Sequence, residues 1–283
     1  MILAAVLVRY LMGTVCEVDA ADPAQVAAAF DEAARVERMI STWRSDSELS
    51  TGRYSPELQS LIREVEAWRD KTGGAFEPRI RPLIDAWKTR GDGAVPDAAT
   101  IGAALQQIHS GNAPIEEGAF GKGYALDRML TKITGDTVLN FGGQIAVRGR
   151  APVTIADPLH RERPLVALTI ENASLSTSSG SEKSFLVNGR RFTHIIDPRS
   201  GEALPPRGSV SVIASTATEA DILSTALYVM GADEGLRWAN AHGVAALFID
   251  RDIVASKAFP EFAVITNERS ESRHPLRHYE RTH

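Results

Sequence analysis

The chain has 283 residues, of which 43% are hydrophobic and 24% charged, a mixture typical of an ordinary globular protein rather than a disordered or membrane-spanning one. Its net charge of -5, from 31 Lys and Arg against 36 Asp and Glu, provides no general electrostatic attraction to nucleic acid. Because Cys16 is the single cysteine, an intrachain disulfide and a zinc site built on several thiolates are both excluded.

The first predicted element is an apolar strand over residues 1–8, which we expect to be buried. The segment lacks a basic start and a small-residue cleavage pattern, so it does not resemble a signal peptide. Later runs fall short of the roughly 20 apolar residues that a membrane helix requires, so we expect no membrane insertion. We expect the chain as given to be cytoplasmic, or periplasmic if a leader was removed.

Helices dominate the next part of the chain. After a second strand at residues 15–18, Asp22-Pro23 supplies an N-cap and a first helical position, and apolar residues then recur at helical spacing. Ser55-Pro56 repeats this start signal, and Gly73-Gly74 ends the second helix. A third short helix is predicted after Asp97.

Strands dominate the remainder, and Asn188-Gly189 is a strong hairpin signal. A capping box from Thr216 to Glu219 opens a helix that Gly231 ends, and a further short helix follows. The predicted strands are 137–141, 145–147, 165–170, 185–187, 192–196, 210–214, 245–249 and 253–255. The mixture predicts an α+β fold with a largely antiparallel central sheet flanked by helices. We expect a single domain over residues 1–266 and a polar, solvated tail over 267–283.

Two candidate functional segments consist of small and hydroxyl residues. Residues 118–127 form a glycine-rich turn that runs into a helix, and the free N–H groups of a helix N-terminus bind anions. Residues 176–181 are a hydroxyl cluster between strands that can hydrogen-bond phosphates. Taken singly, an ordinary turn and a polar loop explain these segments equally well.

Two further segments carry chemically active side chains. His194 lies on a strand just before a Pro/Gly turn, where function concentrates, although a lone histidine is more often structural. Asp221 and Thr225 are four residues apart and share one helix face, so they present two hard oxygen ligands that suit Mg²⁺. The alternative is a first-turn Asp that compensates the helix dipole, with Thr225 bonding back to the backbone.

Taken together and in this order, the segments resemble the ApbE-type FAD:protein FMN transferases, also called flavin transferases. The likeness runs through most of the chain: Met12-Gly13-Thr14, residues 46–50, residues 73–78 with Pro82-Leu83 and Trp87, residues 122–125 with Asp127, and residues 140–143, 177–180, 194–201 and 221–225. It implies a flavin dinucleotide in a cleft of the α+β fold. It also implies transfer of FMN from FAD onto a threonine hydroxyl of a partner protein, with release of AMP.

Carried over by position, the resemblance implies three groups of site residues. Mg²⁺ is bound by Asp221, Thr225 and the backbone carbonyl of Ala119. The binding site for FAD, the substrate, is lined by Met12, Trp43, Ala75, Phe76, Glu77, Glu116, Lys122, Thr177, Ser178, Ser179 and Gly180. His194 lies beside the reacting phosphate, and our hypothesis is that it accepts the proton of the incoming threonine or water.

The sequence departs from the family pattern in several places, and the Asn that is familiar after the Ser-Glu-Leu-Ser segment is missing at Ser50-Thr51-Gly52-Arg53. Glu116-Glu117-Gly118-Ala119 stands where an acidic-Leu-Gly-Gly stretch is usual, and Gln144 occupies a position where a carboxylate is expected. Two other functions stay open: an FAD diphosphatase, in which water replaces the threonine, and a flavin-binding protein that has lost catalysis. The retained Asp221, Thr225 and His194 favour an enzyme over the last.

Overall fold

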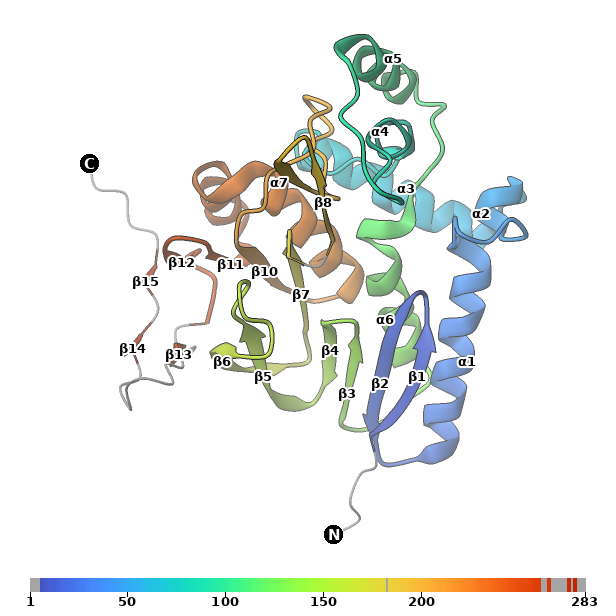
Figure 1. Ribbon diagram of the computed structural model, residues 1–283. Helices are drawn as coiled ribbons and strands as arrows, with labels where there is room; N and C mark the ends of the chain where they lie inside the picture. The colour runs from blue at the N-terminus through green and yellow to red at the C-terminus, as the bar shows by residue number, and fades with distance from the viewer. Residues whose placement is uncertain (1–5, 182, 261–263, 266–273, 276, 279–283) are drawn as a thin grey trace.

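The structure is a computed structural model, and it describes residues 6–181, 183–260, 264–265, 274–275 and 277–278. Among these residues a nine-stranded sheet forms the centre of the fold, and its strands are antiparallel except for the β12–β15 pair, as the sequence predicts (Figure 1). Its strand order is β1 (Leu7–Leu11), β2 (Thr14–Ala20), β3 (Thr137–Phe141), β4 (Gln144–Arg148), β7 (Ser174–Ser179), β10 (Ser209–Ala214), β11 (Ala245–Ile249), β12 (Ile253–Ala255) and β15 (Arg277–His278).

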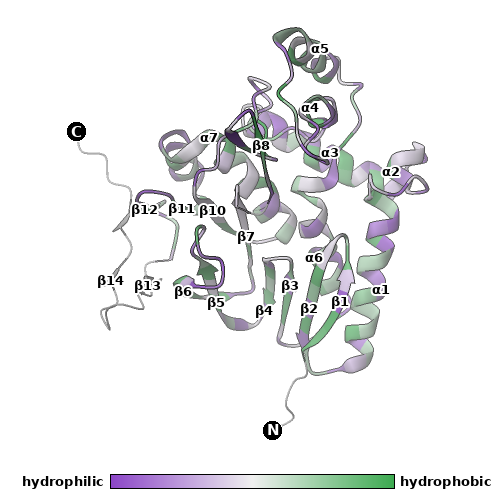
Figure 2. Ribbon diagram, in the orientation of Figure 1, coloured by the Kyte–Doolittle hydropathy of each residue, from purple (hydrophilic) through white to green (hydrophobic). Residues whose placement is uncertain are grey.

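Three helices cover one face of this sheet: α1 (Pro23–Ile40), α6 (Gly121–Leu130) and α7 (Ala217–His242) (Figure 1). Apolar side chains from the helices and from the inner face of the strands form the main core, with Phe30, Leu126 and Leu223 at its centre. Figure 2 shows hydrophilic and hydrophobic residues alternating along α1, as expected of a helix with one buried face. α3 (Pro56–Lys71) packs into the same core.

The opposite face of the main sheet is covered in part by a second sheet. Its strand order among the described residues is β14 (His274–Pro275), β13 (Val264–Ile265), β6 (Pro164–Glu171) and β5 (Arg150–Ala156). Val153 and Val166 of this sheet belong to one apolar cluster with Leu175 and Leu247 of the main sheet. The main sheet is therefore buried on both faces where β7, β10 and β11 lie.

A third apolar cluster joins α4 (Arg81–Trp87) and α5 (Ala98–His109) to the hairpin of β8 (Ser184–Val187) and β9 (Arg190–Thr193). The Trp87 ring packs on Phe192 and donates a hydrogen bond from Nε1 to the Gly201 carbonyl at 2.8 Å. Asn188 and Gly189 have positive φ angles of 51° and 74°, which confirms the predicted hairpin turn.

The predicted helix starts are confirmed by their caps. The side chains of Asp22, Ser55, Asp97 and Thr216 each accept a hydrogen bond from a backbone N–H in the first turn that follows. Gly231, with φ 75° and ψ 176°, interrupts α7, so one helix ends there and another begins. The sequence did not predict the short helices α2 (Glu48–Thr51) and α4, the 3₁₀ helix η1 (Glu117–Ala119), or the strands β5, β7 and β13 to β15.

Two predictions about strands are corrected. Residues 1–5 lie outside the described part. Val8 is 55% exposed, so the first strand is not buried, because among the described residues β1 is an edge strand that pairs with β2 alone. The strand predicted at 192–196 ends at Thr193, and Ile196 forms an isolated bridge with Ala203. No helix among the described residues combines the length and the apolar character needed to cross a membrane.

Candidate functional site

The contact between α6 and α7 anchors Asp221. This residue is 3% exposed, and its Oδ2 accepts a hydrogen bond from the backbone N–H of Gly123 at 3.1 Å. A Cβ at position 123 would lie 2.3 Å from the Ala217 carbonyl oxygen, closer than any side chain tolerates. Glycine at this position therefore allows α6 to approach α7 and to hold the predicted metal ligand.

The other carboxylate oxygen of Asp221 is held by Gln144, at the start of β4. Gln144 Nε2 donates to Asp221 Oδ1 at 2.7 Å, and the glutamine is 6% exposed. Burial raises the pKa of Asp221, while the positive charge of Lys122 opposes that shift. The sequence gives no sign of the Gln144 contact, because the two residues are far apart in the chain and meet only across the sheet and helix layers.

Hydroxyl groups gather beside Asp221, where β7 faces α7. Ser178 Oγ lies 2.9 Å from Ser224 Oγ and 3.2 Å from Thr225 Oγ1, and Thr225 donates to the Asp221 carbonyl at 3.3 Å. Asp221, Thr225 and Ser178, which the sequence placed in one site, are thus brought together. The hydrogen bond from Thr225 to the backbone, which the sequence offered as the alternative to a metal-binding role, is therefore present as well.

The segment 177–180 is not the loop that the sequence suggests, because residues 174–179 form β7 and pair with β10. Side chains alternate along a strand, so Ser178 faces α7 while Thr177 and Ser179 face the other side of the sheet. Thr177 hydrogen-bonds Ser211 at 2.8 Å, and Ser179 donates to the Gly208 carbonyl at 3.0 Å. Thr177 and Ser179 therefore do not face the α7 helix that carries Asp221.

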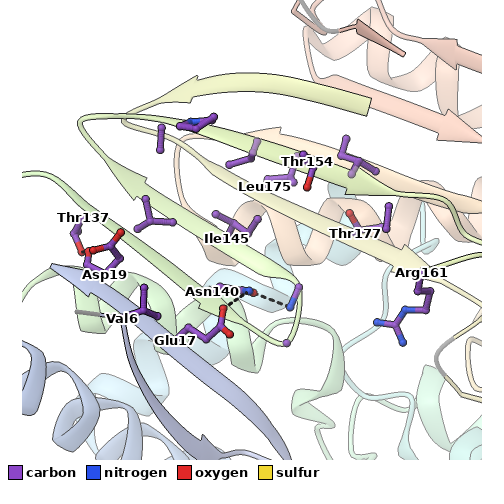
Figure 3. Close-up of a pocket in the computed structure, with 18 of the residues that line it drawn as sticks. Val6, Glu17, Asp19, Thr137, Asn140, Ile145, Thr154, Arg161, Leu175 and Thr177 are labelled. Atoms are coloured by element: carbon purple, nitrogen blue, oxygen red, sulfur yellow. Dashed lines mark hydrogen bonds between the residues drawn. The ribbon is translucent and has the colours of Figure 1, made fainter. Parts of the chain in front are cut away.

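A cavity of about 810 Å³ lies on that other side, and Thr177 and Ser179 help to line it (Figure 3). Figure 3 also places Ile145, Leu175 and Glu17 around this cavity. Its lining includes neither Asp221 nor His194. The cavity is therefore separate from the Asp221 cluster. We place the candidate site at the cluster because the buried carboxylate of Asp221 lies there beside hydroxyl groups.

His194 follows directly after β9 rather than lying on a strand. Its Nδ1 lies 3.0 Å from the Lys183 carbonyl oxygen, which can only accept, so Nδ1 carries the proton. The neutral ring then has its lone pair on Nε2, as a general base requires. A Cβ at Gly180 would lie 2.4 Å from the Thr193 side chain, so the end of β7 packs directly against the residue before His194.

Trp43 and Glu116 form a cluster with Arg90, a residue that the sequence did not single out. The Arg90 guanidinium lies over the Trp43 ring at 4.4 Å and pairs with Glu116 at 2.6 Å. Arg90 also bonds Thr42, whose hydroxyl donates to Glu117 at 2.6 Å. Trp43 is 66% exposed, so its ring presents a surface on which another ring can stack. Glu116 is 9% exposed, and its carboxylate is neutralised by the Arg90 guanidinium.

The remaining residues predicted to line FAD lie in tight turns or in the core. Met12, with φ 45°, and Gly13 make the two-residue turn between β1 and β2. Ala75 and Phe76 are at most 2% exposed, so we expect them to meet a ligand through the backbone. Glu77 accepts from the Arg79 N–H at 2.8 Å, and burial raises the pKa of its carboxyl group.

The oxygen atoms around Asp221 are suitable ligands for a hard cation. Asp221 supplies a carboxylate, Thr225 a hydroxyl, and Gln144 Oε1 is a buried acceptor that receives no hydrogen bond from any described residue. Ala119 is the last residue of η1, one residue before α6, and carries the backbone carbonyl of the predicted ligand set. No group of three or more His, Cys, Asp and Glu side chains in the described part of the chain is arranged to hold a metal. A cation here would draw on one carboxylate and on substrate phosphates, as Mg²⁺ commonly does.

Comparisons with known proteins identify relatives of this chain. The chain is 29% identical to an FAD:protein FMN transferase of Klebsiella pneumoniae (strain 342) over 83% of this chain and 85% of that protein. It is 29% identical to one of Treponema pallidum (strain Nichols) over 86% of this chain and 83% of that protein.

Solved structures show the same fold. The ApbE protein of Thermotoga maritima has a TM-score of 0.82 at 23% identity, covering 90% of this chain and 97% of that one. The flavinyl transferase ApbE of Pseudomonas stutzeri has a TM-score of 0.79 at 23% identity, covering 90% and 95%. The model of the ApbE family matches residues 12–248, which is most of the chain. The chain therefore belongs to the ApbE family.

Proposed function

We propose that this chain is a magnesium-dependent FAD:protein FMN transferase, which moves FMN from FAD onto a threonine hydroxyl of a partner protein and releases AMP. Two relatives that bear the name FAD:protein FMN transferase align with it over 85% and 83% of their own lengths. The observation that carries the proposal is the anchored carboxylate of Asp221, which lies among the hydroxyls of Ser178 and Thr225 at the N-terminus of α6.

The N-terminus of α6 supports binding of the FAD diphosphate. The N-cap residue, Phe120, makes no side-chain hydrogen bond to this helix, and the Gly123 N–H in its first turn is held by Asp221. Lys122, the second residue of the helix, adds a positive charge that favours the ionised form of Asp221. The first-turn N–H groups of Gly121 and Lys122, together with the lysine side chain, would form a site for the oxygens of a phosphate.

In the proposed reaction, the acceptor threonine oxygen bonds to the phosphorus of the FMN phosphate. The bond from that phosphorus to the bridging oxygen breaks, and AMP leaves with this oxygen. Nε2 of His194 takes the threonine proton, because Nδ1 is committed to the Lys183 carbonyl. When bound, Mg²⁺ lowers the negative charge that repels the incoming hydroxyl. Asp221 and Thr225, with the Ala119 carbonyl, would hold it.

Product analysis tests the proposed reaction. Purified protein is mixed with FAD, Mg²⁺ and a peptide bearing the acceptor threonine, and AMP release and the mass of the peptide are followed. AMP together with flavinylated peptide supports the transferase. AMP with free FMN supports the diphosphatase, in which water is the acceptor, and binding of FAD without AMP supports a flavin-binding protein.

The role of His194 is tested by the His194→Ala variant. We expect it to bind FAD like the wild type, measured by fluorescence quenching, and to lose AMP release by about 100-fold or more, since general bases contribute 10²- to 10⁴-fold. His109→Ala, at the exposed end of α5, is the matched control and should retain full activity. Full turnover by His194→Ala would remove the histidine from the mechanism.

A further inference from the structure

One buried polar atom in the candidate site lacks the partner that its burial demands. Gln144 opens β4 directly after the glycine turn that follows β3, and it is 6% exposed. Its Nε2 donates to Asp221 Oδ1 at 2.7 Å. Its Oε1 is buried and accepts no hydrogen bond from any residue that the structure describes. Leaving such an acceptor unpaired costs about 1–3 kcal/mol.

The orientation of this amide is set by its neighbour. Exchanging the two ends of the amide would turn Oε1 toward Asp221 Oδ1 and would take from Nε2, a donor, the acceptor that lies 2.7 Å from it. Asp221 cannot turn aside, because its Oδ2 is held by the Gly123 N–H at 3.1 Å. Oε1 is therefore fixed beside the carboxylate with its lone pairs uncommitted to any described residue.

The nearby hydroxyl groups do not supply the missing donor. Ser224 donates to the Asp221 carbonyl at 3.0 Å, and Thr225 donates to the same carbonyl at 3.3 Å. Ser178 lies within hydrogen-bond distance of both of these hydroxyls. The hydroxyl cluster thus satisfies itself and the backbone, and Oε1 needs a partner from outside the described residues.

We propose that Oε1 of Gln144 is a further oxygen ligand of the divalent cation that Asp221 and Thr225 hold, an inference that rests on the proposed function. An amide carbonyl is a hard neutral oxygen, which Mg²⁺ and Mn²⁺ accept. Because glutamine adds no charge, Asp221 remains the carboxylate of the site. One carboxylate leaves the bound cation with a net positive charge. We therefore expect the cation to bind weakly alone and more tightly together with FAD, whose phosphates supply the remaining negative charge.

The test measures Mn²⁺ binding to the full-length protein, with and without FAD, by electron paramagnetic resonance of the free ion. Gln144→Met removes both amide atoms at nearly constant size, and Gln144→Glu keeps an oxygen but removes the donor. We expect Gln144→Met to lower Mn²⁺ affinity about 10- to 100-fold, the loss typical of a disrupted metal site. We expect Gln144→Glu to bind Mn²⁺ at least as tightly as wild type. Gln59→Met, whose side chain bonds an exposed carbonyl, is the matched control.

Thermal unfolding provides a second measurement and shows whether each variant folds. Without Mn²⁺, Gln144→Glu should melt below wild type, because two carboxylates then face each other, and Mn²⁺ should raise its melting temperature more than that of wild type. If Gln144→Met does not fold, the comparison of the Mn²⁺-induced melting shifts of Gln144→Glu and wild type tests the ligand role by itself. A smaller Mn²⁺ shift in Gln144→Glu than in wild type would overturn the ligand role.

The remaining outcomes are also decisive. Wild-type affinity in Gln144→Met overturns the proposal, and so does an equal loss in both variants, since that result assigns Gln144 only the task of orienting Asp221. If wild type binds no Mn²⁺ even with FAD, the metal dependence of the proposed function fails as well. Binding of Mn²⁺ and release of AMP by wild type, with no effect of Gln144→Met, would sink the further inference alone.

Discussion

Asp127, on α6, accepts two hydrogen bonds from Thr218, in the first turn of α7: one from the backbone N–H at 2.8 Å and one from the hydroxyl at 2.6 Å. The Ala217 N–H donates to the same carboxylate at 2.7 Å, and Thr216 Oγ1 accepts from Glu219 N–H. The first three N–H groups of α7 are thereby satisfied, two of them by another helix. This interhelical cap fixes the start of the helix that carries Asp221.

Replacing Asp127 by Asn should weaken this cap, because one acceptor oxygen becomes an amide that cannot accept from a backbone N–H. We expect the variant to lose about 1–2 kcal/mol of unfolding free energy in a urea titration. Asp92→Asn, in an exposed turn, is the control and should change the unfolding free energy by less than about 0.5 kcal/mol. Equal stability of the two variants would contradict the capping role of Asp127.

Gly123→Ala tests the close approach of α6 and α7. The added methyl group would lie 2.3 Å from the Ala217 carbonyl oxygen and 2.9 Å from the Asp221 Cβ, so the helices must separate. We expect destabilisation of about 1–3 kcal/mol and loss of AMP release, since the N–H that holds Asp221 moves away.

Gly102→Ala is the matched control for that substitution. Gly102 lies inside α5, and its added Cβ would meet nothing within 4 Å. Alanine is the better helix former, so this variant should gain about 0.5–1 kcal/mol of stability. The melting temperatures of the two variants should therefore move in opposite directions, and a parallel change would refute the steric explanation.

Glu32 links stability to acid pH. It accepts from Arg35 at 2.8 Å and pairs with Arg128 at 3.2 Å, which joins α1 to α6. The hydrogen bond from Arg35 is the main cause that lowers the pKa of Glu32 from 4.5 to about 2. A depressed carboxyl pKa adds stability that is complete above the unfolded value of 4.5 and is lost as pH falls through the folded value of about 2.

Glu32→Gln should therefore flatten the loss of stability between pH 5 and pH 2, with a difference at neutral pH on the order of 2–3 kcal/mol. Urea titrations at several pH values measure this slope. Glu37→Gln, on the same helix, is the control and should keep the wild-type slope. If Glu32→Gln also keeps that slope, the ion-pair network does not contribute as the geometry indicates.

Arg90→Met tests the cluster with Trp43 and Glu116. The substitution keeps much of the apolar stem but leaves Glu116, 9% exposed, without its 2.6 Å partner. We expect a loss of about 1–3 kcal/mol, because the buried carboxylate loses its short contact and keeps Arg81, whose Nη1 is 3.8 Å away. Arg69→Met, which breaks the exposed pair with Asp70, should cost less than about 1 kcal/mol. Melting curves that show equal costs would contradict the burial argument.

Local signals predicted many elements of this fold correctly. The Pro residues after Asp22 and Ser55, the hairpin turn at Asn188-Gly189 and the break at Gly231 each depend on backbone preferences within a few residues. Burial of the first strand could not be predicted in this way. An apolar run does not reveal whether its strand lies at the centre or at the edge of a sheet, and in the part of the chain that the structure describes β1 has a neighbouring strand on one side only.

The candidate site likewise combines local features that the sequence predicts with contacts that depend on the tertiary structure. The spacing of Asp221 and Thr225 on one helix face is a local property, so sequence alone determined it, and the collinear motifs identified the ApbE family. Only the tertiary structure decided that Gln144 and Gly123 hold the two oxygens of Asp221, and that Thr177 turns away from α7 while Ser178 faces it. These contacts depend on strand register and helix packing, which bring together residues that are distant in the chain and carry no mark of one another in the sequence.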